Sequence, residues 1–353
     1  MILLLQILLY PFAILYGLAT SFRNYLYRAG YKKSAHFDTV VISVGNLTVG
    51  GTGKTPHVEY LIRLLKDRFK IATLSRGYGR KTKGFIWADD RSTAETIGDE
   101  PMQFYYKFKN EVKVTVGEKR ILAIPTILKE SETEVILLDD AYQHRKVERN
   151  LDILISDYNH PFYNDFILPA GRLRESRRGA KRADIVVISK CPPELQIGEK
   201  QEIKRSVDRY TKSSAPVFFT SIKYGAPVPV YNKMAFEGKI LAVSGIARSE
   251  LFETYVKGNY NFFNHLKFKD HHHYTQDDIN SVIQEFNRIK EPQKSILITE
   301  KDMVKWQAFS INKILKDYPV FYLPIEVEFL EGKGMFDQMV FDSITRQVKE
   351  IGK

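Results

Sequence analysis

The sequence predicts an α/β protein of two domains, the first built around a mostly parallel sheet. Short apolar, β-branched runs alternate with segments of helical periodicity along most of the 353 residues, a pattern typical of parallel sheets covered by helices. A glycine-rich loop lies between the first such run and the first such helix. Prolines and glycines within residues 216–232 then interrupt the alternation and predict a linker to a second, smaller α/β/α domain.

Composition limits the class of protein. At 353 residues the chain is long enough for two domains with separate cores. Hydrophobic residues make up 44% and charged residues 27%, which excludes a disordered chain. The net charge of +11 suits nucleic acid, an anionic membrane face or a phosphorylated substrate. The single cysteine, Cys191, excludes an internal disulfide framework and fits a reducing cytosol.

The first twenty residues are almost entirely apolar. They lack the positive n-region of a secretory signal peptide. A membrane-spanning helix needs ~20 apolar residues, and Gln6, Pro11 and Gly17 interrupt this stretch. Arginines, lysines and tyrosines follow it closely. We therefore predict a helical membrane-interface segment over residues 1–35 that lies on an anionic leaflet. The alternatives are a helix hairpin packed on the first domain and a helix that spans the membrane.

The glycine-rich loop has the context of a P-loop. It reads Thr48-Val49-Gly50-Gly51-Thr52-Gly53-Lys54-Thr55, between a predicted buried strand over residues 39–44 and a helix over residues 57–65. In a P-loop, backbone N–H groups surround phosphate oxygens, the lysine reaches the β- and γ-phosphates, and the threonine hydroxyl binds Mg²⁺. The first domain is therefore predicted to be a P-loop NTPase-like α/β/α sandwich whose loop residues 48–55 bind the nucleotide.

One position departs from the P-loop pattern. The pattern G-x-x-x-x-G-K-[ST] has glycine where this chain has Thr48. Its backbone must therefore adopt a conformation that a β-branched residue allows. The alternative interpretation is a glycine-rich turn with a chance Lys-Thr pair.

Basic and acidic residues follow other predicted strands, at the edge of the sheet where α/β proteins bind ligands. Arg76 begins a basic glycine turn after one strand. Arg120 follows the next strand and is either a phosphate ligand or a solvated arginine. An apolar run over residues 135–138 ends in Asp139 and Asp140. Such a strand is typical of a Walker B motif, whose aspartate binds Mg²⁺ directly or through water; a strand-end turn is the alternative.

Two more segments of the first domain have two interpretations each. Asp99 precedes a helix over residues 102–108 and is either a capping carboxylate or a functional group. Six basic residues lie within the eleven positions from Arg172 to Arg182. They form either a solvated basic face or a patch for a phosphorylated or anionic surface.

The second domain contains three adjacent histidines, His271, His272 and His273, after Asp270. Adjacent side chains diverge and the chain offers no cysteine nearby, so these residues do not predict a metal site. A histidine that acts beside a carboxylate is the favoured interpretation, with exposed polar loop residues as the alternative. A strand over residues 320–329 is expected to pair with the linker and form a β-ribbon between the domains.

These segments give the predicted domain boundaries, which are as follows: a membrane-interface segment over 1–35, the P-loop domain over 36–215, a linker strand over 216–235, the smaller α/β domain over 236–318, and a return strand with a C-terminal helix over 319–353.

Seven blocks of the chain, in order, resemble the bacterial tetraacyldisaccharide 4′-kinases, the lipid A 4′-kinases. The blocks are Gly45 to Pro56, Ser75-Arg76-Gly77-Tyr78-Gly79, Gly98-Asp99-Glu100-Pro101, Asp139-Asp140-Ala141-Tyr142-Gln143-His144, Leu168 to Glu175, Asp270-His271-His272 and Thr299-Glu300-Lys301-Asp302. That family also tolerates Ser or Thr at the position of Thr48. The blocks cover nearly the whole chain and are together far more specific than a P-loop alone.

The resemblance implies an activity and a location. The family transfers the γ-phosphoryl group of ATP to the 4′-hydroxyl of a tetraacyldisaccharide 1-phosphate, which gives lipid IVA. It has two α/β/α domains and attaches, as a peripheral or monotopic protein, to the cytoplasmic face of the bacterial inner membrane. The expected cofactors are ATP and Mg²⁺, and the expected partners are the lipid substrate and an anionic membrane surface. The sequence indicates neither a nucleic-acid partner nor an obligate protein partner.

Roles for single residues are expected from the motifs and, for Asp99 and its histidine, from the resemblance. Asp99 is the expected general base, assisted by His271 or His272, of which His271 is favoured; closure of the two domains would complete the site. The other expected catalytic residues are Lys54 and Arg174. The expected metal ligands are Thr55, Asp139 and Asp140, with Glu100 or Glu175 assisting. The expected substrate-binding residues are Asn46, Arg76, Arg120 and Arg172.

Two other functions compete with this interpretation. A soluble P-loop small-molecule kinase or GTPase-like metallochaperone would share the loop, but a polar substrate gives no reason for an apolar N-terminus. A basic nucleic-acid-binding module would suit the net charge and the 20 tyrosines. No basic sheet motif with interleaved aromatic residues supports the second alternative, and binding driven by charge alone would be weak and steeply salt-dependent.

Overall fold

The computed structural model describes residues 2–231, 234–307 and 309–351. Residue 1 of the predicted interface segment, residues 232–233 of the predicted linker and residues 352–353 of the predicted C-terminal segment lie outside the described residues. The chain forms two compact units. Unit 1 comprises residues 1–76, 110–222 and 327–353, and unit 2 comprises residues 77–109 and 223–326. The predicted boundaries placed residues 77–109 in the first domain, whereas their contacts group them with the second.

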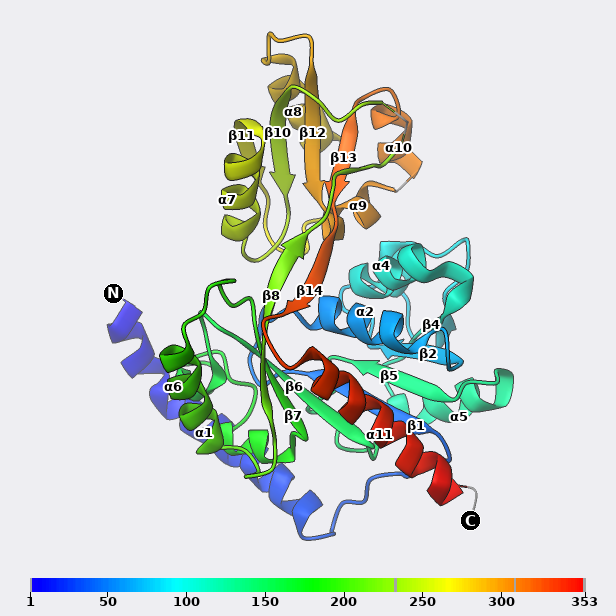
Figure 1. The fold of residues 1–353 in the computed structure, drawn as a ribbon, viewed down its shortest axis with the longest axis vertical. Coiled ribbons are helices and arrows are strands. Elements are labelled where there is room, and N and C mark those ends of the chain that lie inside the picture. The colour runs from blue at the N-terminus through cyan, green and yellow to red at the C-terminus, as the bar shows by residue number, and fades with distance from the viewer. Residues whose placement is uncertain (1, 232–233, 308, 352–353) are drawn as a thin grey trace. The chain divides into compact units, whose positions relative to one another are not determined.

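Unit 1 is organised around a large, mostly parallel sheet (Figure 1). Its strands are β1 (Val40–Gly45), β2 (Ile71–Ser75), β4 (Lys113–Val116), β5 (Val135–Asp139), β6 (Leu151–Asp157), β7 (Ile185–Ser189), β8 (Val217–Tyr224) and β14 (Ile325–Phe329). They lie in the order β14-β8-β7-β6-β1-β5-β2-β4. Its helices are α1 (Ile2–Arg28), α2 (Lys54–Leu65), α5 (Arg120–Glu130), α6 (Ile197–Asp208) and α11 (Lys333–Ile351), with 3₁₀ turns at Lys109–Glu111, Phe162–Asn164 and Arg177–Arg182.

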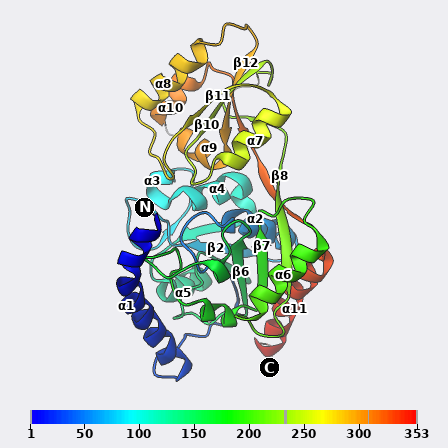
Figure 2. The same cartoon turned by 90° about the vertical axis from the view of Figure 1, so that its left-hand side faces the viewer.

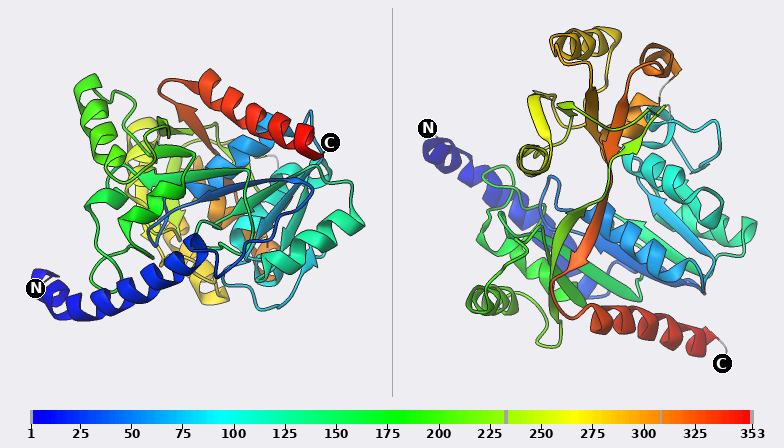
Figure 3. Two further views of the ribbon diagram at one scale, coloured as in Figure 1. Left: turned by 90° about the horizontal axis from the view of Figure 1, so that it is seen from below. Right: turned by 45° about the horizontal axis from the view of Figure 1, so that its top comes forward.

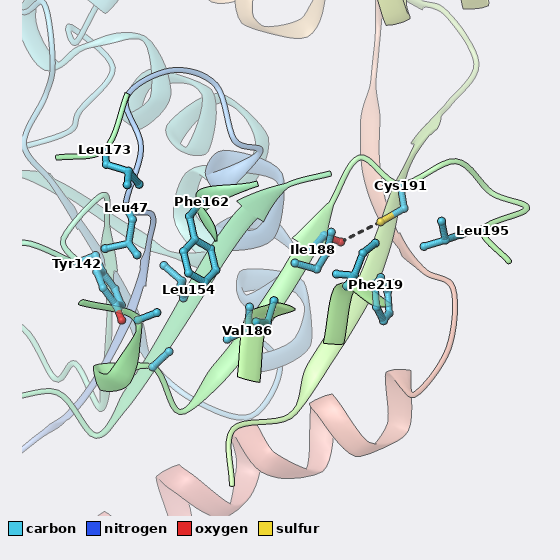
Figure 4. Packing of buried hydrophobic residues seen from close by; sticks show 14 residues of the cluster. Leu47, Tyr142, Leu154, Phe162, Leu173, Val186, Ile188, Cys191, Leu195 and Phe219 are labelled. Carbon is cyan, nitrogen blue, oxygen red and sulfur yellow. Dashed lines mark hydrogen bonds between the residues drawn. The ribbon is translucent and has the colours of Figure 1, made fainter. Parts of the chain in front are cut away.

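Helices cover both faces of this sheet. Successive residues of a strand point to opposite sides, so neighbouring residues of one strand contact helices on different faces. On β8, the ring of Phe218 lies 5.4 Å from that of Phe336 on α11. Its neighbour Phe219 joins a buried cluster that includes Ile203 and Val207 of α6 and Val186 and Ile188 of β7 (Figure 4). The arrangement is therefore the α/β/α sandwich that the alternating pattern predicts.

The central strands β1, β5 and β6 are buried along their whole length. Continuous apolar runs with helices on both sides are what parallel strands require. The register pairs Val44 of β1 with Asp139 of β5, both at the carboxyl end of their strands. The P-loop and the predicted Walker B aspartates therefore emerge from neighbouring positions at one edge of the sheet.

Helix α1 is a single helix that continues through Pro11 and runs along one side of unit 1 (Figure 2). The hairpin alternative is therefore wrong. A narrow strip of small residues, Ala13, Gly17 and Thr20, faces the protein. No described helix is long and apolar enough to cross a membrane.

Unit 2 has a smaller sheet in the order β11-β10-β12-β13-β9, with helices around it (Figure 3). The strands of this sheet are β9 (Val228–Pro229), β10 (Lys239–Ser244), β11 (Asn261–Lys267), β12 (Lys294–Thr299) and β13 (Val320–Leu323). The short β3 (Ile86–Trp87) falls within the residues of unit 2 but is not part of this sheet. The helices of unit 2 are α3 (Ala94–Ile97), α4 (Asp99–Phe108), α7 (Glu250–Asn259), α8 (Gln276–Asn287), α9 (Glu300–Trp306) and α10 (Phe309–Leu315). Strands β10 to β13 are parallel, and only the short β9 is antiparallel.

Two strand predictions need correction. The expected single strand over residues 320–329 is two strands, β13 and β14, separated by Pro324, which cannot donate a backbone hydrogen bond to a sheet. Strand β14 lies beside β8, as the predicted ribbon requires. The sequence analysis also missed β11, because its polar and aromatic residues do not alternate and none of its positions is fully buried.

Candidate active site

The glycine-rich loop of unit 1 has the backbone of a phosphate-binding turn. Gly50 and Gly53 have φ of 101° and 85°, a region that β-carbon-bearing residues rarely adopt. Gly53 caps helix α2, which begins at Lys54. Unpaired N–H groups at a helix N-terminus, together with the positive end of the helix dipole, favour an anion there.

Thr48 is compatible with this loop because its backbone is extended. It forms an isolated antiparallel bridge with Leu173 and is almost fully buried. On either side, the Val49 N–H donates to the Arg172 carbonyl at 2.8 Å and the Arg174 N–H donates to the Leu47 carbonyl at 2.7 Å. A short strap over residues 172–174 thus pairs with the start of the loop, and an extended strap suits a β-branched residue.

The rest of the loop is supported by residues at the carboxyl end of β7 and by His57 of α2. The Ser189 hydroxyl donates to the Thr52 carbonyl at 2.6 Å, and the Lys190 ammonium contacts the Gly51 carbonyl. His57, fully buried on α2, has Nδ1 at 2.7 Å from the Gly53 carbonyl. A carbonyl only accepts, so Nδ1 carries the proton.

The other nitrogen of His57, Nε2, therefore accepts a hydrogen bond from the Thr220 hydroxyl of β8, at 3.1 Å. Burial lowers the pKa of His57 to about 4, although the bond to the Gly53 carbonyl opposes this shift. A neutral imidazole thus connects the loop to β8. The sequence analysis did not single out His57 or Thr220, because one is part of a helix and the other follows 163 residues later.

Asp140 lies between two cations. Its Oδ1 is 3.6 Å from the Lys54 ammonium, and both carboxylate oxygens accept from Arg174 Nη1, at 2.9 and 3.0 Å. Burial would raise the pKa of Asp140, but Lys54 and Arg174 outweigh it and hold the pKa below its ordinary value. Asp140 also has φ of 46°, so its carboxylate leaves the sheet edge from a left-handed turn directly after β5.

Three of the expected site residues are strongly buried. The guanidinium of Arg120 donates to the carbonyls of Asp139 and Asp140, at 2.9 and 3.4 Å, and its burial lowers its pKa. Asn46 Nδ2 donates to the Thr52 hydroxyl at 2.9 Å, while its Oδ1 has no hydrogen-bond partner among the described residues. Glu175 is 0% exposed.

The Glu175 carboxylate accepts hydrogen bonds from Asn24, Gln143 and both terminal nitrogens of Arg182, the shortest being 2.5 Å from Asn24. It therefore joins α1 to the strap and to the loop after β5. Arg172 pairs with Asp165 at 3.0 Å, and Arg76 is exposed at the end of β2. The structure thus brings the loop, Asp139, Asp140, Arg120 and Arg174 to one edge of the sheet.

Thr55 and Asp139 have the chemistry that Mg²⁺ requires. Thr55 lies in the first turn of α2 and Asp139 ends β5, so hydroxyl and carboxylate oxygens occur at the same sheet edge. The described residues contain no group of three or more His, Cys, Asp or Glu side chains placed to bind a metal. Mg²⁺ usually binds through one or two carboxylates together with substrate phosphates and waters, so the residues present fit this ion.

A second cluster, in unit 2, surrounds Asp99. This residue begins α4, and the N-cap is Gly98, with no capping hydrogen bond from a side chain. The capping alternative for Asp99 is therefore wrong. Its side chain is only 9% exposed, and Oδ2 lies 3.1 Å from His271 Nδ1 and 3.3 Å from the Lys305 ammonium. Gly98 has φ of 95°, a conformation that favours glycine, and a β-carbon there would also lie 3.1 Å from the backbone of Gly77.

His271 lies between Asp99 and Lys301. Because a carboxylate only accepts, Nδ1 donates to Asp99, and Nε2 is left to accept from the Lys301 ammonium at 3.2 Å. Its backbone has φ of 54°, and its ring lies 5.2 Å from that of Tyr78.

The three histidines differ in their contacts. His272 Nε2 instead pairs with Asp278 at 2.9 Å, and His273 is exposed. Of the three, only His271 is seen to contact Asp99.

Cations hold Asp99 in its charged form. Burial would raise its pKa, but the hydrogen bond from His271 and the charges of Lys305 and Lys301 outweigh burial, so the pKa of Asp99 lies below its ordinary value. Lys305 is 6% exposed and also lies 3.9 Å from Asp302. Asp302 is fully buried and accepts from Gly245 N–H, Thr299 Oγ1 and Tyr274 OH.

Lys305 was missed by the sequence analysis. It lies one helical turn beyond Lys301 on α9, and that i, i+4 spacing was the available signal. Glu100, an expected metal ligand, is part of this second cluster and lies 3.3 Å from Lys301. The structure thus groups Asp99, Glu100 and His271 in unit 2, separately from the loop residues of unit 1.

Known proteins resemble the chain over nearly its whole length. A family model described as Tetraacyldisaccharide-1-P 4′-kinase, LpxK, matches residues 5–345. Proteins named Tetraacyldisaccharide 4′-kinase from Flavobacterium johnsoniae and Flavobacterium psychrophilum are 44% and 43% identical, over 98% and 95% of this chain and 98% and 96% of their own. A solved structure of LpxK from Aquifex aeolicus in complex with ATP is 30% identical, with a TM-score of 0.75, and covers 96% of this chain and 99% of that one.

Proposed function

The chain belongs to the tetraacyldisaccharide-1-P 4′-kinase family, and we propose that it transfers the γ-phosphoryl group of ATP to the 4′-hydroxyl of a tetraacyldisaccharide 1-phosphate, forming lipid IVA in lipid A biosynthesis. Family membership argues against the metallochaperone and nucleic-acid alternatives. The observation that carries the proposal is the presence of both required parts, a phosphate-binding loop and a buried, ionised carboxylate beside a histidine.

In unit 1, the loop residues 48–55 bind the triphosphate. Backbone N–H groups and the start of α2 neutralise the phosphate charge, and Lys54 binds the β- and γ-phosphates. Asp140 keeps Lys54 and Arg174 together before the nucleotide arrives, which the contacts of 3.6 and 2.9 Å support. When the γ-phosphate enters, both cations are available to stabilise charge on the transferring group.

Mg²⁺ would be bound by Thr55 and Asp139, with Asp140 contributing through water. It would supply charge neutralisation on the β- and γ-phosphates. The contacts of the other expected ligands favour different roles. Glu175 already accepts from Asn24, Gln143 and Arg182 and acts in positioning the strap. Glu100 pairs with Lys301 and acts in the second cluster.

In unit 2, Asp99 accepts the proton of the 4′-hydroxyl as the general base. Its low exposure removes water from the carboxylate, and the low pKa ensures that it is ionised at neutral pH. His271 orients the carboxylate by donating Nδ1–H to Oδ2. The transfer requires that the groups of both units act on the same phosphoryl group during the reaction. Arg76, which is exposed, and Arg172 are proposed to bind substrate, whereas the buried side chains of Arg120 and Asn46 position the Asp139–Asp140 segment and Thr52.

We further propose that α1 lies on the cytoplasmic face of the inner membrane as a peripheral anchor. Its large apolar side chains face away from unit 1: Leu8, Phe12, Leu15, Leu18 and Phe22 are each more than 60% exposed. Contiguous exposed apolar surface of this kind is uncommon on proteins that contact only water. Arg23, Arg28, Lys32 and Lys33 follow it and suit an anionic leaflet.

The activity is tested by incubating the full chain with γ-labelled ATP and a tetraacyldisaccharide 1-phosphate in detergent micelles. We expect labelled, bisphosphorylated lipid. Parallel reactions with GTP and with water-soluble sugar acceptors distinguish the alternative P-loop enzymes. Label transferred to a soluble sugar, but not to the lipid, would contradict the proposal.

The anchor is tested separately, by deleting residues 2–20. We expect the truncated protein to move from the membrane pellet to the supernatant. Removing the basic run alone, by changing Arg28, Lys32 and Lys33 to Gln, is the matched variant that leaves the apolar face in place. Unchanged sedimentation after the deletion would contradict the anchor.

A further inference from the structure

A basic hollow of about 350 Å³ lies in unit 1, away from the nucleotide loop. Its lining contains five cationic residues, Arg145, Arg149, Lys181, Arg182 and Lys212. Only two acidic residues line it, Glu148 and Asp152. This excess of positive charge in a concave site favours an anion.

The hollow is at the opposite end of the sheet from the P-loop. Arg182 precedes β7 and Lys212 precedes β8, at the amino ends of these parallel strands. Ser189, at the carboxyl end of β7, contacts the P-loop instead. The five residues of β7 separate the two places by roughly 16 Å. The hollow is therefore a site distinct from the one that binds the triphosphate.

Existing ion pairs leave part of the positive charge unbalanced. Arg149 pairs with Asp152 at 2.7 Å, Arg182 with Glu175 at 2.7 Å and Lys212 with Asp184 at 2.7 Å. For Arg145 and Lys181, the described part of the chain shows no ion pair.

Arg145 is the clearest unbalanced cation. It donates to the Asn24 carbonyl at 2.9 Å and lies over the Tyr27 ring. Burial lowers the pKa of Arg145, and the charges of Arg182, Arg149 and Arg23 lower it further, while the charge of Glu175 opposes them.

The cations that a ligand in the hollow can reach are the exposed Lys181 and Lys212 and the half-buried Arg145. Lysine and arginine side chains bind phosphate oxygens through charge-assisted hydrogen bonds. The chemistry that suits this lining is therefore a phosphate group.

We propose that this hollow binds the phosphate group of an anionic lipid headgroup at the membrane surface. Ser34, which follows α1, lines the hollow, and Arg145 is bonded to α1 through Asn24. The exposed side chains of Phe22 and Tyr25 lie on the same part of α1. A lipid beside that helix would therefore present its headgroup to the hollow. The choice of a lipid as the source rests on the proposed membrane contact, whereas the phosphate chemistry does not.

The test compares the full chain with two double variants of equal net charge. Lys181→Gln/Lys212→Gln removes two exposed cations of the hollow, and Lys129→Gln/Lys290→Gln removes two exposed lysines elsewhere. A non-hydrolysable ATP analogue, kept saturating, fills the P-loop so that the probes do not bind there. One arm measures stabilisation by glycerol 1-phosphate against chloride at matched ionic strength. The other measures sedimentation with phosphatidylcholine vesicles, with or without 30% phosphatidylglycerol.

We expect the hollow variant to bind glycerol 1-phosphate and phosphatidylglycerol vesicles at least about fivefold more weakly than the wild type and the control variant. Binding to pure phosphatidylcholine should be equal in all three. A loss confined to glycerol 1-phosphate would support the phosphate site and overturn the lipid as its source. Equal binding by all three proteins would overturn the site.

Kinase activity with a micellar acceptor distinguishes this proposal from the proposed function. Activity should be the same in both double variants, because neither changes a residue of the reaction site. A matching loss of activity and binding in the hollow variant would overturn the proposal of a distinct site. Absence of activity in the wild type would contradict the proposed function and leave the binding result intact.

Discussion

The nucleotide loop of unit 1 and the Asp99 cluster of unit 2 are assembled differently. The loop is a continuous run of eight residues, and its phosphate-binding groups are backbone N–H groups that follow one strand and begin one helix. The Asp99 cluster joins side chains that are far apart in the sequence: Asp99 begins α4, His271 follows β11, and Lys305 lies on α9. The first site depends mainly on main-chain groups, to which Lys54 adds a charged side chain, and the second is made of charged side chains.

This difference determines how each site responds to change. The loop depends on supports behind it, such as His57 and Thr220, which position backbone groups. Their loss should weaken nucleotide binding. The Asp99 cluster depends on charge balance in a site with little water, where Lys301 and Lys305 keep a buried carboxylate ionised. Their loss should change the rate and its pH dependence while nucleotide binding remains.

The largest effect is expected at Asp99. Asp99→Asn keeps the size of the side chain but removes the base, so turnover should fall by about 10²- to 10⁴-fold. Steady-state turnover with the lipid acceptor checks this. Asp277→Asn, on the exposed surface of α8, is the control and should be active. Turnover near the wild-type value in Asp99→Asn would mean that another group takes the proton.

The next effect separates the three histidines. His271→Gln removes the Nδ1 contact with Asp99 and should lower turnover by roughly 10- to 100-fold, with little change in the KM for ATP. His272→Gln changes the contacts with Asp278, Phe268 and Tyr274 but none with Asp99, and His273→Gln changes an exposed side chain. Both should keep turnover near the wild-type value. An equal loss in all three variants would contradict a specific role for His271.

Lys305→Met should change the pH profile. Burial raises the pKa of Asp99, and the positive charge of Lys305 lowers it. When that charge is removed, the effect of burial is less fully offset, so the pKa of Asp99 rises. Since the base must be deprotonated, the acid limb of the kcat profile should move toward neutral pH. Lys305→Arg keeps the charge and should restore the profile. A uniform loss of rate with an unchanged profile would indicate that Lys305 acts only in packing.

The smallest effect concerns the support of the loop. Thr220→Val is isosteric but removes the hydroxyl that bonds to His57, so the KM for ATP should rise roughly fivefold, the equivalent of about one hydrogen bond. Thr220→Ser keeps the hydroxyl and should restore the KM. Thr115→Val, which removes another buried hydroxyl of the same sheet, controls for general loss of stability. Equal KM values for Thr220→Val and Thr220→Ser would contradict the role of this bond.

The sequence predicted unit 1 better than unit 2. Strands buried on both faces, such as β1, β5 and β6, are continuous apolar runs that local patterns identify. The loop was equally visible, because one contiguous segment makes the site. The extended conformation of Thr48, by contrast, depends on a strap 125 residues later, and no local pattern indicates such a pairing.

The parts of the site that the sequence did not predict depend on contacts between residues far apart in the chain. Asp99 and His271 were paired only through family resemblance. Lys305 was not found, because its i, i+4 spacing from Lys301 indicates a shared helix face but not the distant carboxylate that both lysines approach. The capping role considered for Asp99 failed because Gly98 occupies the N-cap. Glu175 looked like a metal ligand beside other charged residues, but the structure buries it among four hydrogen-bond donors from three side chains.

The most direct test of the proposal that unit 1 binds the nucleotide and unit 2 accepts the proton is the affinity for ATP. It is measured by calorimetry on Lys54→Met and Asp99→Asn side by side. The account predicts that Lys54→Met weakens binding by at least about tenfold, because a charge-assisted contact is lost, and that Asp99→Asn binds ATP as the wild type does. Equal weakening in both variants, or tight binding by Lys54→Met, would contradict the assignment of nucleotide binding to unit 1 and proton transfer to unit 2.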